Sequence, residues 1–308
     1  MKKLRHFISV DDLDRELIED LFDRARFFHD NYGLIEHNIL NRKRLLSVFC
    51  EPSTRTRFSF EAAMYELGGQ VITSEDAGIS SSFAKDESVE DAMRVISHYG
   101  HIIVLRHKTD GIMEKAISFC DIPFINGGEG KREHPTQTLL DLFTIDQEQG
   151  QIDDLTIGMA GDLVNGRTIH SLAAALAKFY RDVRMVFVSP PQLSLPNYVK
   201  DTLNEYEVSF VEYNSLTEAP IDELDCLYMT RLQKERFDDP RDFDAVKDCC
   251  ILRPELVEQM NKKAIVIHPL PRVKEIPTSV DSDPRAKYFK QAANGLYVRM
   301  ALLEHMLK

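Results

Sequence analysis

Short apolar runs alternate with segments of helical periodicity along most of the chain. In the first half, apolar runs of strand length lie at residues 45–51, 70–73, 101–107 and 122–126. The segments between them are typical of helices and cover about residues 58–67, 88–98 and 111–120. A strand–helix–strand rhythm of this kind predicts a parallel sheet that is covered by helices on both faces.

The same alternation restarts in the second half of the chain. Strands are expected at residues 155–160, 184–189, 208–213, 225–230 and 264–269. Helices are expected after His134, after Arg167 and over about residues 284–307. Near the N-terminus, Ser9 and Asp12 form a capping-box pattern, which we expect to open an acidic helix that extends to about His29.

We therefore predict the α/β fold class, with two domains that each contain a mainly parallel sheet with helices on both faces. The expected domains cover residues 1–134 and 152–283, joined by a linking helix at residues 135–151. Residues 284–308 are expected to form a C-terminal helix that packs back across both domains. A chain of 308 residues is long enough for two such domains.

Composition and charge exclude several classes of function. The net charge of −12 disfavours general nucleic-acid binding. No apolar run approaches the ~20 residues of a membrane-spanning helix, and the basic N-terminal residues are not followed by the apolar core of a signal peptide. The five cysteines are odd in number and lack paired spacing, which argues against a disulfide framework or a zinc site and favours a cytoplasmic protein.

The strongest candidate for chemistry is the turn after the first predicted strand. Residues 53–57 read Ser-Thr-Arg-Thr-Arg and directly precede a predicted helix. Free backbone N–H groups at a helix N-terminus bind anions, and hydroxyl and guanidinium groups add further donors. The segment therefore predicts a phosphate site. The alternative is an ordinary N-cap followed by surface arginines.

Polar residues also follow the other predicted strands, at the edge where open α/β sheets bind ligands. They are Arg106, His134 with Gln137, Arg167, Arg231 with Gln233, and the run from His268 to Arg272. The helix dipole lowers the pKa of a histidine directly before a helix, so His134 can be neutral at pH 7 and donate a hydrogen bond to a carbonyl oxygen. For each residue alone, a solvated side chain, an N-cap or a strand terminator is the alternative. Together, the cations predict one site for two anionic substrates.

One further class of function is disfavoured by the glycine pattern. Residues 158–167 read Gly-Met-Ala-Gly-Asp-Leu-Val-Asn-Gly-Arg and invite a dinucleotide-binding interpretation. The spacing G-x-G-x-x-G is absent, so a nicotinamide-dependent dehydrogenase is not expected. A glycine-rich turn with Arg167 at the next helix start suits a carboxylate instead.

Five motifs occur in a fixed order along the chain. They are Ser-Thr-Arg-Thr-Arg at 53–57, His-Pro-x-Gln at 134–137, Gly-Asp-x-x-x-Gly-Arg-Thr at 161–168, Thr-Arg-x-Gln at 230–233 and His-Pro-Leu-Pro-Arg at 268–272. Together they resemble the aspartate/ornithine carbamoyltransferase superfamily. The last two motifs favour the aspartate branch, because the ornithine enzymes typically carry His-Cys-Leu-Pro where this chain has Pro269.

The resemblance implies transfer of the carbamoyl group of carbamoyl phosphate to the amino group of L-aspartate, a step of pyrimidine biosynthesis. The first domain would bind carbamoyl phosphate and the second L-aspartate. It also implies a homotrimer with shared active sites and no metal or organic cofactor. A separate regulatory chain is left open.

The resemblance further implies roles for individual residues. Carbamoyl phosphate would be bound by Ser53, Thr54, Arg55, Thr56, Arg106, His134 and Gln137, and by Ser81 and Lys85 of a neighbouring subunit. Of these, Thr56, Arg106 and His134 would be catalytic, acting on the carbamoyl oxygen. L-Aspartate would be bound by Lys85, Arg167, Arg231, Gln233 and the carbonyl group of Leu270.

One departure from the family pattern concerns the loop that carries Lys85. The family usually has Lys-Gly-Glu, whereas this chain has Asp86 in the middle position, which removes the freedom of glycine and adds a negative charge near phosphate. We also hypothesise that Glu51, a carboxylate among cations, pairs with Arg167 or Arg236 when the domains close.

Two other functions are compatible with parts of this sequence. One is the same chemistry on ornithine, whose cationic side chain Arg231 should repel. The other is a non-catalytic binding protein on the same fold, since a fold alone does not imply a function. Such a protein would be expected to have lost some of the phosphate or carbonyl contacts.

Overall fold

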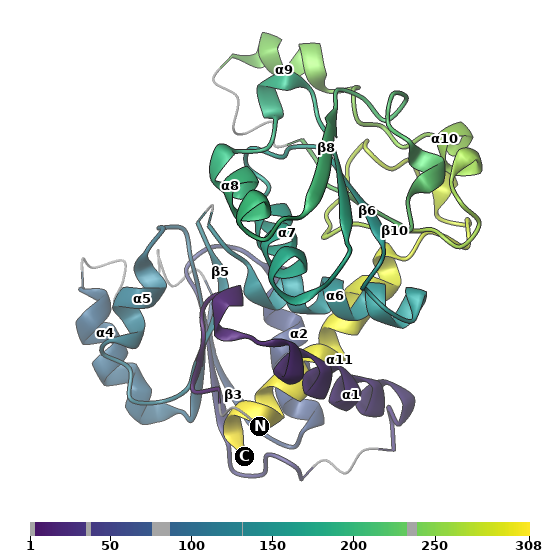
Figure 1. Cartoon of the computed structure of the whole chain (residues 1–308). Helices are drawn as coiled ribbons and strands as arrows, with labels where there is room; N and C mark the ends of the chain where they lie inside the picture. The colour runs from purple at the N-terminus through teal and green to yellow at the C-terminus, as the bar shows by residue number, and fades with distance from the viewer. Residues whose placement is uncertain (1–3, 35–37, 76–86, 131, 233–238) are drawn as a thin grey trace. The chain divides into compact units, whose positions relative to one another are not determined.

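The computed structural model describes residues 4–34, 38–75, 87–130, 132–232 and 239–308 (Figure 1). Contacts within the chain divide it into two units. Unit 1 consists of Met1–Leu140 and Ala293–Lys308, and unit 2 consists of Asp141–Ala292. Among the described residues, no helix has the length and apolar character needed to cross a lipid bilayer.

Unit 1 is built on a parallel sheet whose strands lie in the order β1-β5-β4-β2-β3. The strands are β1 (His6–Phe7), β2 (Arg44–Phe49), β3 (Gln70–Ser74), β4 (Ile102–His107) and β5 (Phe124–Glu129). Strands β2 and β4 are almost completely buried, as expected of apolar strands at the centre of a parallel sheet. Phe49 pairs with Arg106 across them, so both strands end at the same edge.

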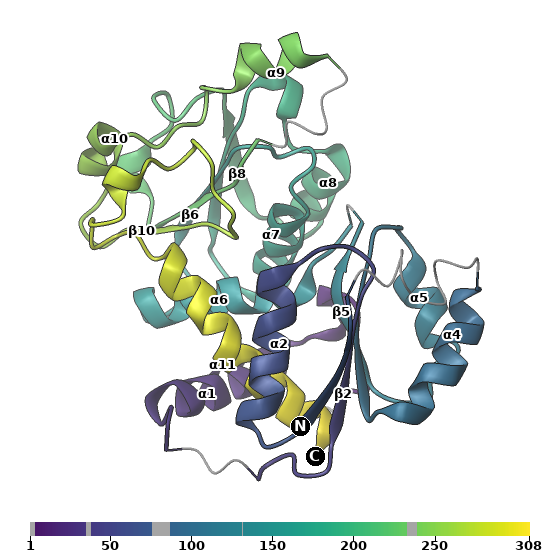
Figure 2. The ribbon, with the colours of Figure 1, turned by 180° about the vertical axis from the view of Figure 1, so that it is seen from behind.

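Helices cover both faces of this sheet (Figures 1 and 2). Helices α4 (Val89–Ile96) and α5 (Ile112–Ile117) lie on one face, and α1 (Arg15–Asp30) and α2 (Thr54–Glu66) lie on the other. The apolar side chains between the sheet and the first pair of helices include Leu46, Val48, Met93, Ile103, Leu105 and Met113. Burial of such side chains is the main favourable term in folding.

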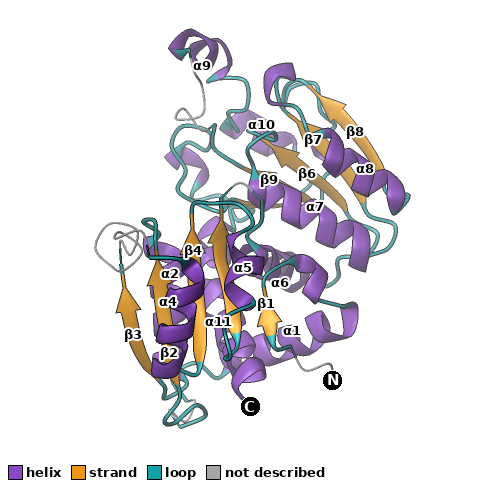
Figure 3. Cartoon of the chain, turned by 90° about the vertical axis from the view of Figure 1, so that its left-hand side faces the viewer, coloured by secondary structure: helices purple, strands orange, loops and turns teal. Residues whose placement is uncertain are grey.

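Unit 2 contains a second parallel sheet, in the order β10-β9-β6-β7-β8 (Figure 3). Its strands are β6 (Thr156–Ala160), β7 (Arg184–Val188), β8 (Ser209–Tyr213), β9 (Cys226–Met229) and β10 (Ile265–Ile267). Helices α7 (Arg167–Phe179) and α8 (Asn197–Glu205) cover one face, and α10 (Pro254–Gln259) lies on the other. The predicted fold class is therefore confirmed: an α/β protein with two parallel sheets and helices on both faces of each.

Two helices contribute residues to both units. Helix α6 (Pro135–Gln149) begins in unit 1 and ends in unit 2, because the division falls after Leu140. Helix α11 (Tyr288–Leu307) begins in unit 2 and ends in unit 1. In unit 1, the carboxylate of Glu304 on α11 forms an ion pair with Arg24 on α1.

Several local predictions were wrong for identifiable reasons. The capping box of Ser9 and Asp12 is present, but it heads only a short 3₁₀ turn, because Asp14 caps α1 separately. Helix α2 begins four residues earlier than predicted, at Thr54 rather than at residue 58. Helix α9 (Pro240–Val246) was not predicted; it begins with Asp239 as N-cap and proline at the first helical position.

Candidate active site

The turn between β2 and α2 presents the N-terminus of a helix at the carboxyl edge of the first sheet. Ser53 is the N-cap of α2, but its side chain makes no capping hydrogen bond. Thr54 and Arg55 are exposed, and Thr56 is buried. The first turn of α2 contains no acidic residue, so the positive end of the helix dipole is not neutralised from within the turn. This geometry suits an anion.

The two arginines of the turn differ in their surroundings. The side chain of Arg57 is only 13% exposed, and its Nη1 atom lies 2.8 Å from Oε2 of Glu75. It also lies over the ring of Phe58. Arg55 is exposed on the same turn. Arg55 is therefore the arginine of this pair that is more open to a ligand.

Arg106 lies at the end of β4, next to this turn. Its Nη2 atom lies 2.7 Å from Oε1 of Glu51, and its Nη1 atom donates a hydrogen bond of 3.2 Å to the carbonyl oxygen of Gly127. Burial lowers the pKa of Arg106, while the carboxylate of Glu51 acts in the opposite direction. Guanidinium groups stay protonated in proteins, so Arg106 places a fixed positive charge at the sheet edge.

The Glu51–Arg106 ion pair was not predicted from the sequence. We expected Glu51 to pair with Arg167 or Arg236, and that pairing stays a prediction. Arg236 lies outside the described residues. In the structure, Glu51 reaches Arg106 because Cys50, directly after β2, donates its N–H to the carbonyl of Arg106 and so keeps the turn beside β4.

Gly128, at the end of β5, brings Arg106 and His134 together. A Cβ atom at this position would lie 2.5 Å from Nη1 of Arg106 and 3.4 Å from Cδ2 of His134. The φ angle of Gly128 is +123°, which side-chain-bearing residues rarely adopt. Gly128 is therefore a residue that the site requires and that sequence reasoning missed. The Gly-Gly pair at 127–128, directly after a predicted strand, was the sequence feature that could have indicated a position that requires glycine.

His134 directly precedes α6 and is 5% exposed. Its carbonyl accepts hydrogen bonds from the N–H groups of Gln137 and Thr138, which form the first turn of the helix. Gln137 is half-buried in that turn. The turn after β2, the end of β4 and the segment after β5 belong to three neighbouring strands, so the described residues predicted to bind carbamoyl phosphate lie along one edge of the unit 1 sheet.

In unit 2, Arg167 lies at the first position of α7, after the glycine-rich turn that follows β6. Gly161 has a φ angle of +125°, and a Cβ atom there would lie 2.3 Å from the carbonyl oxygen of Thr230. The carboxylate of Asp162 is fully buried and accepts hydrogen bonds from the backbone and side chain of Asn165. Asp162 thus stabilises the turn that precedes Arg167.

Arg231 follows β9, which pairs with β6, and Leu270 follows β10, which pairs with β9. Arg231 is half-buried and comes two residues after β9, and Leu270 comes three residues after β10. Because β6, β9 and β10 are adjacent and parallel, Arg167, Arg231 and Leu270 lie along one edge of the unit 2 sheet. Ser81, Lys85 and Gln233 lie outside the described residues.

Comparison with known proteins agrees with this arrangement. The family model for the carbamoyl-phosphate-binding domain of aspartate/ornithine carbamoyltransferases matches residues 5–147. The model for the aspartate/ornithine-binding domain of the same family matches residues 153–306. The chain belongs to this family. Within the family, the relatives below point to the aspartate branch.

The chain is similar over its full length to several curated members of the family. It is 47% identical to the aspartate carbamoyltransferase catalytic subunit of Methanocaldococcus jannaschii, and the match covers 99% of this chain and 98% of the relative. It is 45% identical to the chloroplastic aspartate carbamoyltransferase of Arabidopsis thaliana, covering 99% of this chain and 78% of that protein.

Solved structures give the same result. The catalytic subunit of the M. jannaschii aspartate transcarbamoylase superimposes with a TM-score of 0.91 at 48% identity, covering 98% of each chain. The Trypanosoma cruzi enzyme in complex with carbamoyl phosphate superimposes with a TM-score of 0.93 at 36% identity, covering 99% of this chain and 97% of that one.

Proposed function

We propose that the chain is an aspartate carbamoyltransferase, which transfers the carbamoyl group of carbamoyl phosphate to the amino group of L-aspartate. The products are N-carbamoyl-L-aspartate and phosphate. Family membership and the similarity to catalytic subunits of this enzyme support the proposal. The structural observation that carries it is the meeting of Arg106 and His134 around Gly128, beside a helix N-terminus suited to phosphate.

Carbamoyl phosphate binds at the carboxyl edge of the unit 1 sheet in this proposal. The N-terminus of α2 holds the phosphate through Ser53, Thr54, Arg55 and Thr56. Thr56, Arg106 and His134 donate hydrogen bonds to the carbamoyl oxygen. Gln137 binds the carbamoyl amine, and Ser81 and Lys85 of a neighbouring subunit complete the site.

L-Aspartate binds at the carboxyl edge of the unit 2 sheet. Arg167, Arg231 and Gln233 hold its two carboxylates, with Lys85 as a further cation. The carbonyl group of Leu270 accepts a hydrogen bond from the reacting amine. The guanidinium group of an arginine binds a carboxylate through two hydrogen bonds, whereas it repels the ammonium group of an ornithine side chain. The arginines therefore favour a dicarboxylic amino acid over ornithine.

The chemistry needs positioning and fixed positive charge. The deprotonated amine of aspartate attacks the carbamoyl carbon, and negative charge develops on the carbamoyl oxygen. Donors aimed at that oxygen stabilise the transition state, and removal of one such donor typically lowers kcat by about 10²–10³-fold. The C–O bond to phosphate then breaks, and the departing phosphate, held by Arg55, takes up the proton that the amine loses.

The assembly and the compartment are part of the proposal. The resemblance to the family supports a homotrimer with shared active sites, in which Ser81 and Lys85 contribute to a neighbouring site. A separate regulatory chain stays open. A cytoplasmic location and a role in pyrimidine biosynthesis are the predictions from the sequence, although relatives in plants are chloroplastic.

The decisive experiment measures phosphate release from carbamoyl phosphate by the purified chain. We expect release that depends on L-aspartate, is far slower with L-ornithine and is lost in Arg55→Ala. Release that L-ornithine supports better than L-aspartate would assign the chain to the other branch of the family. Absence of release with either amino acid from the folded wild type would refute the transferase proposal.

A further inference from the structure

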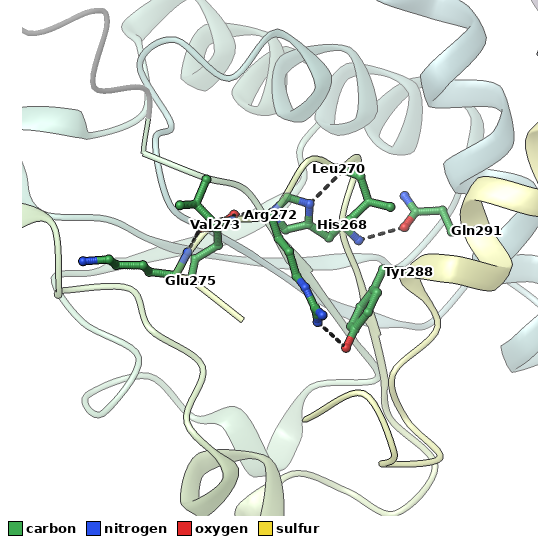
Figure 4. A network of polar contacts seen from close by, with 8 residues as sticks. His268, Leu270, Arg272, Val273, Glu275, Tyr288 and Gln291 are labelled. Carbon is green, nitrogen blue, oxygen red and sulfur yellow. Dashed lines mark hydrogen bonds and ion pairs between the residues drawn. The ribbon is translucent and has the colours of Figure 1, made fainter. Parts of the chain in front are cut away.

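The turn after β10 contains a buried histidine that makes a polar contact on each side of its ring (Figure 4). The side chain of His268 is 1% exposed. Its Nδ1 atom lies 2.8 Å from the backbone nitrogen of Leu270, and its Nε2 atom lies 2.9 Å from Oε1 of Glu275. The imidazole therefore lies between the carboxylate of Glu275 and the backbone of Leu270.

These contacts fix the tautomer of His268. The backbone N–H of Leu270 can only donate, so Nδ1 must accept and cannot carry a proton. The proton of the neutral ring is then on Nε2, where it is donated to Glu275. Burial of the ring lowers the pKa of His268 and outweighs the hydrogen bond and charge of Glu275, which act in the opposite direction, in agreement with a neutral imidazole.

Glu275 is held firmly in place to receive this proton. Its carboxylate accepts hydrogen bonds from the backbone N–H groups of Val273 and Lys274, at 3.0–3.1 Å. Burial alone would raise the pKa of Glu275, but the hydrogen bonds from His268 and the backbone bring it below its ordinary value. Glu275 is therefore an anion that selects the Nε2–H form of His268.

Leu270, which donates to the other nitrogen of the His268 ring, has an uncommon backbone conformation. Leu270 has a φ angle of +53°, a left-handed conformation that residues other than glycine rarely adopt. The hydrogen bond to Nδ1 of His268 holds the N–H of Leu270, and so fixes the orientation of the peptide group between Pro269 and Leu270. The N–H of His268 itself is held by Oε1 of Gln291, which anchors the start of the turn to α11.

We propose that Glu275 and His268 are positioning residues: Glu275 holds His268 as the Nε2–H tautomer, and His268 holds the Leu270 backbone so that its carbonyl meets the substrate amine. This inference rests on the proposed function, which assigns that carbonyl to the reacting nitrogen. It assigns no proton transfer to His268, since both of its ring nitrogens are already engaged.

Two amide substitutions separate the two contacts of the ring. In His268→Asn, the side-chain oxygen can take the place of Nδ1 and accept from Leu270, but no group reaches Glu275. In His268→Gln, the side-chain nitrogen can take the place of Nε2 and donate to Glu275, but no acceptor remains for Leu270. Comparison of the two variants therefore shows which hydrogen bond of the ring, the one to Leu270 or the one to Glu275, matters for activity.

The proposal predicts opposite rankings of activity and stability. His268→Gln should lower kcat by about 10²-fold, because misplacement of a group by about 1 Å has an effect of this size, and His268→Asn should lower kcat by less than about tenfold. His268→Asn should be the less stable of the two in urea, since it leaves the Glu275 carboxylate buried with one donor fewer. KM for carbamoyl phosphate should change little in both variants.

A Glu275→Gln variant completes the test. It should lower kcat in the wild-type background. It should have little further effect on kcat in His268→Asn, because the hydrogen bond from residue 268 to Glu275 is already absent there. ¹⁵N NMR of the ring nitrogens, assigned by comparison with His268→Asn, should show Nδ1 of His268 unprotonated in the wild type and an altered tautomer in Glu275→Gln.

The outcomes are distinguishable from a failure of the proposed function. A wild type that transfers no carbamoyl group to L-aspartate refutes that function. An active wild type in which kcat of the two His268 variants follows their stabilities, or in which Nδ1 carries the proton, overturns the positioning role alone.

Discussion

Gly128 offers a sharp test of the site, because a single methyl group placed there acts directly on Arg106. The Cβ atom of Gly128→Ala would lie 2.5 Å from Nη1 and 3.3 Å from Cζ of Arg106. Ordinary contact requires about 3.4 Å or more, so the guanidinium has to move by about 1 Å. Nη1 would then move away from its acceptor, the carbonyl oxygen of Gly127.

Two effects follow from this change, and their sizes differ. Backbone strain at a φ angle of +123° destabilises the fold by about 1–3 kcal/mol. Displacement of a transition-state donor by about 1 Å lowers kcat by about 10²-fold, because catalysis depends on alignment of the reacting groups. The effect on activity at saturating substrate should therefore exceed what the loss of folded protein explains.

The assay is the initial rate of N-carbamoyl-L-aspartate formation at saturating concentrations of both substrates, with urea unfolding measured on the same preparation. Gly150→Ala is the matched control. Gly150 has a φ angle of +83°, and a Cβ atom there would have no neighbour within 4 Å, so this variant carries backbone strain without displacing any side chain. We expect Gly150→Ala to lose stability and keep its kcat.

Two results would refute this reasoning. If folded Gly128→Ala keeps a kcat within about threefold of the wild type, Arg106 does not need its observed position for catalysis. If Gly150→Ala loses as much kcat as Gly128→Ala, the loss reflects general destabilisation. The expected result is that both variants lose stability and that only Gly128→Ala loses kcat.

Three further predictions concern a donor, a buried carboxylate and a buried histidine. Arg106→Lys should lower kcat by about 10²–10³-fold in the same rate assay, because one ammonium group cannot reach both Glu51 and a substrate oxygen; a kcat near that of the wild type would contradict the assigned role. Tyr228→Phe should lower the free energy of unfolding in urea by about 1–3 kcal/mol, because the buried Asp141 carboxylate loses a 2.9 Å hydrogen bond; unchanged stability would show that the bond is not formed. Burial lowers the pKa of His170 below its ordinary value of 6.5, so the unfolded chain binds a proton first on acidification, and stability should fall as the pH drops below about 6.5. His170→Gln should flatten that part of the profile of unfolding free energy against pH, and an unchanged slope would assign the pH dependence to other groups.

Much of the fold could be predicted because parallel strands are buried on both faces. Apolar runs marked β2 and β4 to within two residues at each end. Strand β5 was placed too early, since the sequence Asn-Gly-Gly reads as a turn. In the structure, Asn126 bonds to the N–H of Gly128 and to the carbonyl of Ile8, so its polar side chain is satisfied within the buried strand.

The positions of candidate residues could be predicted, but their contacts could not. Strand ends placed Arg106, Arg167 and Arg231 at the carboxyl edges of the two sheets without any structural information. The partner of Arg106 depends on how the turn after β2 folds back on β4, which no local pattern encodes. His268 and Glu275 are seven residues apart and meet only because the intervening turn reverses the chain.

The division of α11 between the two units has a consequence for the order in which the molecule is completed. Unit 2 is continuous in sequence, whereas unit 1 is interrupted by it. During synthesis, the sheet of unit 1 emerges first but lacks its last helical segment until unit 2 has been made. Glu304 then pairs with Arg24, and the ring of His305 accepts from the N–H of Leu4. The unit that is synthesised first is therefore completed last, and the surface of unit 1 that the end of α11 covers stays uncovered in the nascent chain throughout that interval.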